Sequence, residues 1–450
     1  MNITSLSVAI ALLLWIVLTY YGQPNAIAIT IAVTTLTGIL WVTEEYPIPV
    51  TSMIPFVLFP ATGILTYNEA ASALGNHAII LLMGAFMLSK AIQKSGVHKR
   101  FALYVISITG GTSGRRLLFA FIITSAILSM WISNTATTLM MLPIALVIIG
   151  SVDDEQIATP LLLGIAYGSS LGGICTPVGT PPNIIFFSVY SETMGREIDF
   201  LQWMSVGLPI AITAIPVLGF WLSRNLKPIA RIKLPDKTVW HVEEKRVLVV
   251  FLFIIILWVS RPYWAAAFDI TTVGDSTIAL AGVLIMFLTN KGGGEKGKLL
   301  DWETAKQIHW GVLLLFASGI CIAKAFMSSG LTLLISDMLA TLSWMSLIQL
   351  IFCICISVTF LTEFTSNTAT ATLLMPILLG AGVGMGLDPK ILMMPAAISS
   401  SCAFMLPVAT APNAIVYGTG YISIKRMAKE GLILNIFVSF IITFYCYILL

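Results

Sequence analysis

The sequence has little charge for its size. Charged residues make up only 10% of its 450 residues and hydrophobic residues 58%, whereas soluble domains carry roughly 25% charged residues. With a mean hydropathy of +0.95, such a chain cannot cover a water-facing surface. Its long apolar runs match the ~20 residues of a spanning helix rather than the ~10-residue alternating segments of a membrane barrel. The composition therefore predicts an all-α polytopic membrane protein.

Motifs for metal, redox and hydrolytic chemistry are also missing. The six cysteines lie in apolar stretches without a Cys-x-x-Cys pair, which argues against a zinc site or a disulfide framework. The four histidines fall at predicted helix ends or in loops, so a membrane-embedded hydrolase would lack a base for its nucleophile. We therefore expect no enzymatic activity, and the net charge of +3 does not indicate a nucleic-acid partner.

The distribution of basic residues predicts the topology. The first apolar run has no Lys or Arg before it, so we interpret it as a spanning helix and not as a removable signal. If the N-terminus is cytoplasmic, only four of the 24 basic residues lie outside: Arg196, Arg261, Lys324 and Lys390. We expect a multi-pass protein of the inner (plasma) membrane with its C-terminus outside. Apolar runs predict helices near 6–21, 26–43, 49–64, 77–93, 157–190, 203–223, 247–263, 275–290, 310–328, 390–421 and 429–449.

Two further apolar blocks, near 116–150 and 345–380, do not fit a single crossing. Residues 117–152 carry no formal charge over 36 positions, too long for one span and too short for two spans with a turn. A polar Ser-Asn-Thr sequence at 133–135 interrupts this block. We interpret each block as a re-entrant hairpin, whose tip must line a cavity because non-helical backbone is not tolerated against lipid.

The chain contains an internal repeat. Three pairs of motifs recur at offsets of 230 to 234 residues: Ser-Asn-Thr-Ala-Thr-Thr at 133–138 with Ser-Asn-Thr-Ala-Thr-Ala at 366–371, Gly-Thr-Pro-Pro-Asn at 179–183 with Ala-Thr-Ala-Pro-Asn at 409–413, and Lys90 and Gly96 with Lys324 and Gly330. If the first hairpin does not cross the membrane, equivalent helices are separated by an odd number of crossings. The repeats are then inverted, as in many secondary transporters.

The repeated polar motifs suit the binding of an anion together with a cation. A helix begins at each Ser-Asn-Thr motif and directs free N–H groups and its positive dipole end at the tip. Proline in the second pair of motifs breaks a helix and leaves carbonyl oxygens for Na⁺. We expect no Lys, Arg or His near either tip, so co-bound cations would neutralise the anion. A lone polar trio is more often a helix–helix contact, but its duplication favours a binding site.

Glu363 is the one acid well inside an apolar block, three residues before the second motif. An ionisable residue at membrane depth is a functional candidate. The sequence leaves open whether Glu363 relays protons, braces the hairpin or has a plain structural role.

The paired Ser-Asn-Thr hairpins, each followed by a broken helix with a Pro-Asn pattern, resemble the divalent anion:sodium symporters over nearly the whole chain. The resemblance implies eleven spanning helices, two opposed re-entrant hairpins, a homodimer and an elevator-type mechanism. It implies scaffold segments at 1–110 and 247–344, transport-domain segments at 111–225 and 345–450, and a basic cytoplasmic loop at 226–246.

The same resemblance implies the site residues. The substrate would contact Ser133, Asn134, Thr135, Thr180, Ser366, Asn367, Thr368 and Thr410. One Na⁺ would lie near Ser129, Ser133, Asn134 and Gly179, and a second near Thr362, Thr365, Asn367 and Ala409. Gly179 and Ala409 have no side-chain oxygen, so they would bind through their carbonyls.

The leading hypothesis is uptake of a C4-dicarboxylate (succinate, malate or fumarate) driven by two or more Na⁺. The alternatives are a Na⁺-independent dicarboxylate exchanger, a Na⁺/sulfate or Na⁺/citrate symporter, and a channel. Symport is favoured because no basic residue replaces a predicted Na⁺ ligand. Beyond substrate, Na⁺ and a second subunit, the expected partner is membrane lipid.

Overall fold

The computed structural model describes residues 3–109, 113–150, 157–226, 240–270, 272–340 and 345–450. The described chain is almost entirely helical, and eight of its helices are long and apolar enough to cross a membrane. The predicted all-α membrane class is confirmed to that extent, while the count of eleven crossings stays a prediction.

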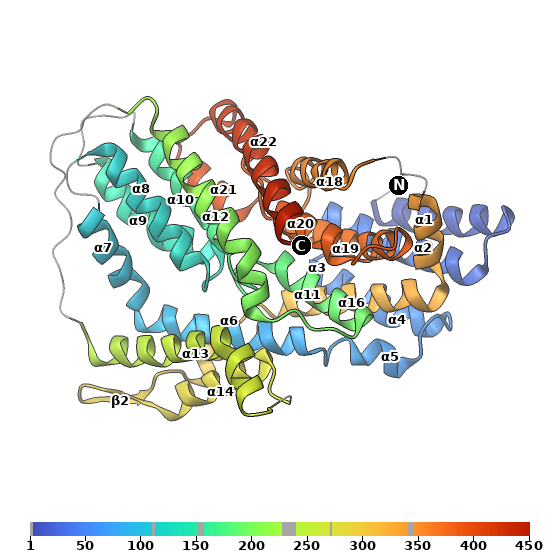
Figure 1. The fold of residues 1–450 in the computed structure, drawn as a ribbon, viewed down its shortest axis with the longest axis horizontal. Coiled ribbons are helices and arrows are strands. Elements are labelled where there is room, and N and C mark those ends of the chain that lie inside the picture. Colours follow the sequence, from blue (N-terminus) through green and yellow to red (C-terminus); the bar gives the residue numbers. More distant parts are fainter. Residues whose placement is uncertain (1–2, 110–112, 151–156, 227–239, 271, 341–344) are drawn as a thin grey trace.

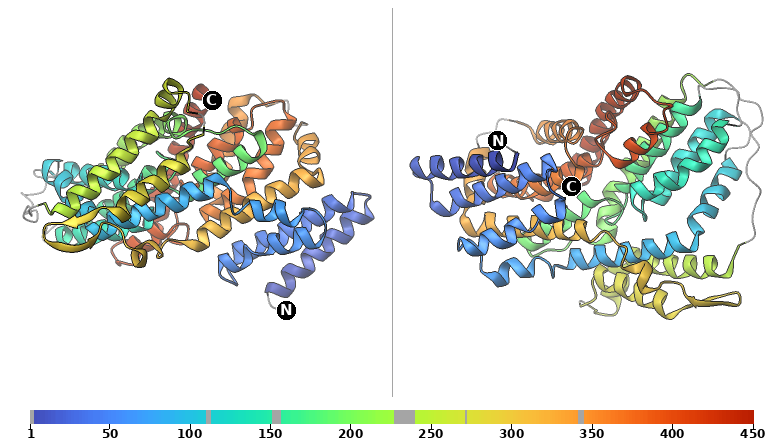
Figure 2. Two further views of the ribbon diagram at one scale, coloured as in Figure 1. Left: turned by 90° about the horizontal axis from the view of Figure 1, so that it is seen from below. Right: turned by 180° about the vertical axis from the view of Figure 1, so that it is seen from behind.

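The helices of the first half begin with a peripheral pair, α1 and α2, which pack mainly on each other at one end of the molecule (Figures 1 and 2). The helices of the first half are α1 (Ile3–Tyr20), α2 (Asn25–Thr43), α3 (Ile48–Thr51), α4 (Ile54–Ala61), α5 (Tyr67–Ser72), α6 (His77–Ser95), α7 (Val97–Thr109), α8 (Gly114–Ser129), α9 (Asn134–Gly150), α10 (Ala158–Gly173), α11 (Pro181–Met194) and α12 (Phe200–Ser223).

The second half starts with two helices, which a short antiparallel hairpin follows. Its elements are α13 (Val242–Ala267), α14 (Asp275–Leu288), β1 (Asn290–Gly292), β2 (Glu295–Lys298), α15 (Trp302–Ala305), α16 (Trp310–Ser329), α17 (Leu331–Ala340), α18 (Leu347–Leu361), α19 (Asn367–Gly384), α20 (Lys390–Ser400), α21 (Ala411–Tyr417) and α22 (Ile424–Leu449).

The order of elements repeats, in agreement with the motif repeat. The series α6 to α12 corresponds element by element to α16 to α22. In each series a long helix is followed by a short one, then two helices joined by a tip of four or five residues, and then a helix broken in its middle. The two predicted hairpin blocks are thus the pairs α8–α9 and α18–α19.

Local sequence signals account for where these helices begin and end. The side chain of Asn76 accepts a hydrogen bond from the backbone N–H of Ala78 (2.9 Å), which satisfies a free donor at the start of α6. Helix α6 ends at Gly96 (φ 76°) and α16 at Gly330 (φ 82°), both in the left-handed region that glycine adopts without strain.

Close helix packing builds the interior of the hairpin region. Gly164, Gly168 and Gly172 of α10 lie against α8, and a methyl group on Gly168 or Gly172 would overlap the α8 backbone. Small residues at every fourth position let two helices approach closely. This packing holds α10 against the first hairpin.

The broken helices interlock the two repeats. The second part of the first broken helix, α11, packs on α19 and α20 of the other half. Its counterpart α21 packs on α9 and α10. Each repeat therefore carries part of its broken helix beside the hairpin of the other, and this brings both tips to the same place.

Three parts of the structure differ from the sequence expectations. The short helices α7 and α17 were not predicted, because both follow a long helix directly after a glycine and are too short to read as spans. The hairpin β1–β2 was not predicted either. The predicted loop at 226–246 extends too far, since α13 begins at Val242, and its residues 227–239 lie outside the described residues.

Candidate functional site

Both hairpin tips and both helix breaks line one cavity of about 260 Å³. All eight residues predicted to contact substrate lie on its wall: Ser133, Asn134, Thr135, Thr180, Ser366, Asn367, Thr368 and Thr410. Gly179 and Ala409 line it too. Residues more than 200 positions apart in the sequence are therefore gathered around a single space.

The first tip is a compact cluster of oxygen atoms. The Ser129 hydroxyl, at the end of α8, donates a hydrogen bond to Oδ1 of Asn134 at the start of α9 (2.6 Å). The Asn134 amide packs against Gly173, where a methyl group would lie 2.6 Å from Oδ1. Gly179 packs in turn on the Gly173 carbonyl. Two of the four residues predicted for the first Na⁺ site, Asn134 and Gly179, thus lie against Gly173, and a third, Ser129, is bonded to Asn134.

The second tip repeats this arrangement with a threonine. The Thr362 hydroxyl donates to Oδ1 of Asn367 (2.7 Å) and lies 3.0 Å from the Ser400 carbonyl oxygen. The Thr365 hydroxyl bonds instead to the Leu361 carbonyl and to the hydroxyl of Thr370. Its side chain is engaged within its own hairpin, so a role for Thr365 in Na⁺ binding would fall to its backbone.

Two asparagines brace the helix breaks, a role that the sequence analysis did not assign. Asn183 Nδ2 donates to the carbonyls of Gly173 (3.0 Å) and Thr176 (2.8 Å). Asn413 Nδ2 donates in the same way to Ala403 (3.1 Å) and Leu406 (3.0 Å). Both side chains are fully buried. Their recurrence after proline in the repeated motif was the available signal.

Glu363 braces the second helix break. Its carboxylate accepts hydrogen bonds from the backbone N–H groups of Phe404, Met405 and Leu406 at 2.7 to 3.0 Å. The side-chain amide of Asn435 donates to it as well (2.7 Å). Of the roles left open by the sequence, these contacts favour bracing.

The expectation that no basic residue lies near the tips was wrong. Lys90 of α6 and His309, which precedes α16, line the same cavity as both tips. Burial lowers the pKa of His309, and the charge of Lys90 lowers it further. Sequence reasoning failed here because these residues reach the cavity from helices far from the tips in the sequence.

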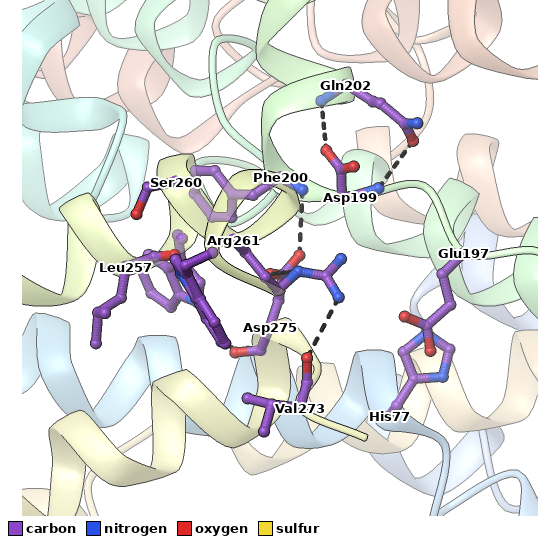
Figure 3. A network of polar contacts seen from close by, with 12 residues as sticks. His77, Glu197, Asp199, Phe200, Gln202, Leu257, Ser260, Arg261, Val273 and Asp275 are labelled. Atoms are coloured by element: carbon purple, nitrogen blue, oxygen red, sulfur yellow. Dashed lines mark hydrogen bonds and ion pairs between the residues drawn. The ribbon is translucent and has the colours of Figure 1, made fainter. Parts of the chain in front are cut away.

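An aromatic and polar network supports the first tip from the side. The Trp131 ring lies parallel to those of Phe200 (centroids 6.0 Å apart) and Trp258 (6.5 Å). Asp275 accepts a hydrogen bond from the Phe200 N–H (3.1 Å) and forms an ion pair with Arg261 at 2.7 Å (Figure 3). The network ties the start of α12 to α13 and α14.

Comparisons with known proteins identify the family of this chain. The family model described as citrate transporter (CitMHS) matches residues 38–389. The sodium-dependent dicarboxylate transporter SdcS of Staphylococcus saprophyticus is 38% identical over 93% of this chain and 85% of its own length. SdcS of Staphylococcus aureus is 36% identical with the same coverage. These matches confirm the resemblance to divalent anion:sodium symporters predicted from the sequence.

Solved structures share the fold at low sequence identity. MtrF of Neisseria gonorrhoeae superimposes with a TM-score of 0.61 at 11% identity, covering 95% of both chains. The YdaH transporter of Alcanivorax borkumensis gives 0.59 at 12% identity, covering 87% of this chain and 89% of its own. These likenesses concern the fold alone.

Proposed function

The chain belongs to the citrate transporter family, and from that premise we propose that it couples inward Na⁺ flow to uptake of a C4-dicarboxylate such as succinate, malate or fumarate. It is a transporter and not an enzyme, as its relatives are. The observation that carries the proposal is the meeting of both hairpin tips in one small cavity. A volume near the lower end of ligand pockets, which span roughly 300 to 1,000 Å³, suits a short diacid.

The site offers two kinds of group that this function needs. Hydroxyl and amide groups of the two Ser-Asn-Thr motifs, with the N-termini of α9 and α19, provide donors for carboxylate oxygens. The Ser129–Asn134 and Thr362–Asn367 clusters provide hydroxyl and amide oxygens, the ligands that hard cations prefer. We propose one Na⁺ beside each cluster, with the carboxylates between them.

We propose an elevator mechanism, which the packing of the elements supports. Helices α11 and α21 each pack on the hairpin region of the other repeat, which supports one moving unit made of the segments at 111–225 and 345–450. Helices α6, α13 and α14 pack on one another and α16 packs on α6, while α6 and α16 also contact α11 of that unit. We propose that the interlocked unit moves against a scaffold at 1–110 and 247–344 and that the scaffold forms a homodimer.

The distribution of basic residues supports a cytoplasmic N-terminus and an outer C-terminus in the plasma membrane. With this orientation the two repeats are inverted, and the hairpins enter the membrane from opposite faces. Lys90, near the end of α6, is then on the cytoplasmic side of the cavity.

Two observations favour specific rivals. Lys90 provides a fixed cation at the cavity, which suits a Na⁺-independent exchanger. The description of the matching family model names citrate. Na⁺/sulfate symport is a further alternative, because sulfate oxygens suit the same donors.

The test is uptake of radiolabelled succinate into proteoliposomes under an inward Na⁺ gradient, with K⁺ replacing Na⁺ in a matched set. A second set is preloaded with unlabelled succinate. We expect saturable uptake that needs Na⁺ and no internal succinate. Uptake that ignores Na⁺ but needs internal succinate would establish exchange instead, and uptake of labelled citrate or sulfate alone would replace the substrate.

Substitutions at the two tips separate a binding site from a helix contact. We expect Asn134→Ala and Asn367→Ala each to raise the Na⁺ concentration for half-maximal uptake by about tenfold or more, since each removes an oxygen from one cluster. Asn68→Ala, on the exposed surface of α5, is the matched control. Normal Na⁺ dependence in both tip variants would contradict the proposed Na⁺ sites.

A further inference from the structure

The cavity lies along one end of each of two scaffold helices, α6 and α16, that contact the moving unit (the segments 111–225 and 345–450). From α6 it is lined by residues between Leu82 and Gln93, in the middle and last part of that helix. From the α16 region it is lined by His309 and Val312, where that helix starts. With the orientation proposed above, these are the cytoplasmic parts of both helices. The cavity of this structure is therefore on the cytoplasmic side of the scaffold.

At the opposite ends of the same two helices, the scaffold holds an acid of the moving unit. Glu192, near the end of α11, forms an ion pair with Lys324, near the end of α16 (2.8 Å). Its other carboxylate oxygen accepts a hydrogen bond from Nδ2 of Asn76, which caps the start of α6 (2.8 Å). Lys324 also donates to the Ser72 hydroxyl of α5 (2.7 Å). One carboxylate thus joins the moving unit to two scaffold helices at their outer ends.

Two further contacts join the same stretch of the moving unit, residues 192–200, to the scaffold (Figure 3). Nε2 of His77, at the start of α6, lies 3.9 Å from Oε1 of Glu197. The N–H of Phe200, which begins α12, donates to the carboxylate of Asp275, which begins α14 (3.1 Å). A displacement of the moving unit along the scaffold has to break these contacts, because each connects residues on the two sides of the boundary.

The internal repeat shows that this acid has no acidic counterpart in the second half. At the offset of 230 residues that relates the two broken-helix motifs, Glu192 corresponds to Ile422. Lys324 corresponds to Lys90, which lines the cavity. Inverted repeats exchange their surroundings when a transporter changes its open side, so the opposite state would bring Lys90 toward Ile422 and not toward an acid. The ionic closure at the outer ends is therefore one-sided.

We propose that Glu192 and Lys324 form a latch that holds the moving unit in the state whose cavity is on the cytoplasmic side. The pair must separate whenever the binding site is presented to the outside, so it sets the ratio of the two states. The proposal rests on the elevator part of the proposed function and involves no contact with substrate or Na⁺. Both side chains are partly exposed (28% for Glu192 and 16% for Lys324), so loss of the pair should change that ratio by about twofold to fivefold.

The test follows the labelling of two matched cysteines in proteoliposomes, on a Cys353→Ser background because Cys353 is the exposed native cysteine. Ser89→Cys reports the cavity as it is now, and Ala323→Cys is its repeat counterpart on α16, which is buried in this state. A membrane-impermeant maleimide is added from the cytoplasmic side for Ser89→Cys and from the outside for Ala323→Cys. We expect Glu192→Gln to raise the labelling rate of Ala323→Cys about twofold to fivefold. Glu192→Lys should raise it further, because two ammonium groups then face each other.

Three comparisons distinguish a latch from a general loosening of the fold. Exchanging the charges, Glu192→Lys together with Lys324→Glu, should return the labelling rate toward that of wild type. Glu303→Gln, which removes an exposed acid paired within the scaffold, should leave it unchanged. Labelling of Ser89→Cys should not rise in any of these variants.

The proposal would be overturned by an unchanged labelling rate of Ala323→Cys in both Glu192 variants. It would also be overturned if the charge-exchanged variant were labelled as fast as Glu192→Lys, or if labelling of Ser89→Cys rose equally. These rates need no transported substrate. A wild type that takes up no succinate would therefore refute the proposed function without changing the result for the latch.

Discussion

The two segments that interrupt the broken helices are alike in sequence but are held by different chemistry. The first break, residues 174–180, reads Ile-Cys-Thr-Pro-Val-Gly-Thr, and the second break, residues 404–410, reads Phe-Met-Leu-Pro-Val-Ala-Thr. Each break is held by the side chain of an asparagine. The first carbonyl of each break packs against a glycine of the next long helix, Gly207 of α12 or Gly431 of α22. These shared features define what any such break requires.

The remaining contacts distinguish the two breaks. In the first, neutral groups donate to backbone carbonyls: Trp203 Nε1 to Ile174 (2.9 Å) and the Thr176 hydroxyl to Met130. In the second, one carboxylate, Glu363, accepts three backbone N–H groups. Met130 stands where the second half has Glu363. The second break also has a neutral donor, since the Tyr167 hydroxyl donates to the Phe404 carbonyl (2.6 Å), so the difference between the two breaks is the added carboxyl group of Glu363.

The largest loss of stability is expected when the glycine against which each break packs is replaced. A methyl group on Gly431 would overlap the Phe404 carbonyl, and one on Gly207 would overlap the Ile174 carbonyl. Because backbone cannot move aside as a side chain can, each change to alanine should cost about 3 kcal/mol or more of stability. The measurement is thermal unfolding of the purified protein in detergent.

The matched control is Gly150→Ala at the end of α9, where a methyl group meets nothing within 4 Å. It should leave the melting temperature nearly unchanged. If Gly207→Ala and Gly431→Ala melted like Gly150→Ala, the close packing of both breaks on α12 and α22 would be wrong.

A smaller loss of stability should distinguish the two repeats. Glu363→Gln keeps the size of the side chain but replaces one acceptor oxygen by a donor that faces backbone N–H groups. We expect a loss of about 2 to 3 kcal/mol in stability, together with weaker Na⁺ dependence. Met130→Gln at the equivalent place should cost less, because no backbone N–H there depends on that side chain. Equal losses in both variants would remove the proposed asymmetry.

The repeated motifs allowed most of the site to be predicted from the sequence. Ser133 and Thr180 could be paired with Ser366 and Thr410 because each pair has the same polar residues at nearly the same offset. The predicted helices also agree with the observed ones, because apolar runs and the residues that cap them are local signals. The break inside 157–190 was predicted from Pro181 and Pro182.

Contacts between distant segments could not be predicted in this way. Glu363 was a candidate, but its partners at 404–406 lie some 40 residues further on and show no motif for an acceptor. Lys90 and His309 were placed at helix ends, and only the packing of α6 and α16 against the tips brings them to the cavity. Periodicity and motifs describe single elements and do not specify which surfaces of two elements meet.

The smallest effect should be equal in the two halves and would sharpen the comparison. Asn183→Ala and Asn413→Ala each remove two hydrogen bonds to buried carbonyls of one break. Each should cost about 1 to 2 kcal/mol of stability, measured by the same thermal unfolding. Because Asn413 bonds the carbonyl of Leu406 and Glu363 bonds its N–H, the losses of Asn413→Ala and Glu363→Gln should not add in the double variant. A double variant that loses the full sum of the two would mean that the asparagine and the carboxyl group hold the second break independently, and the contrast with the first break would then lie in Glu363 alone.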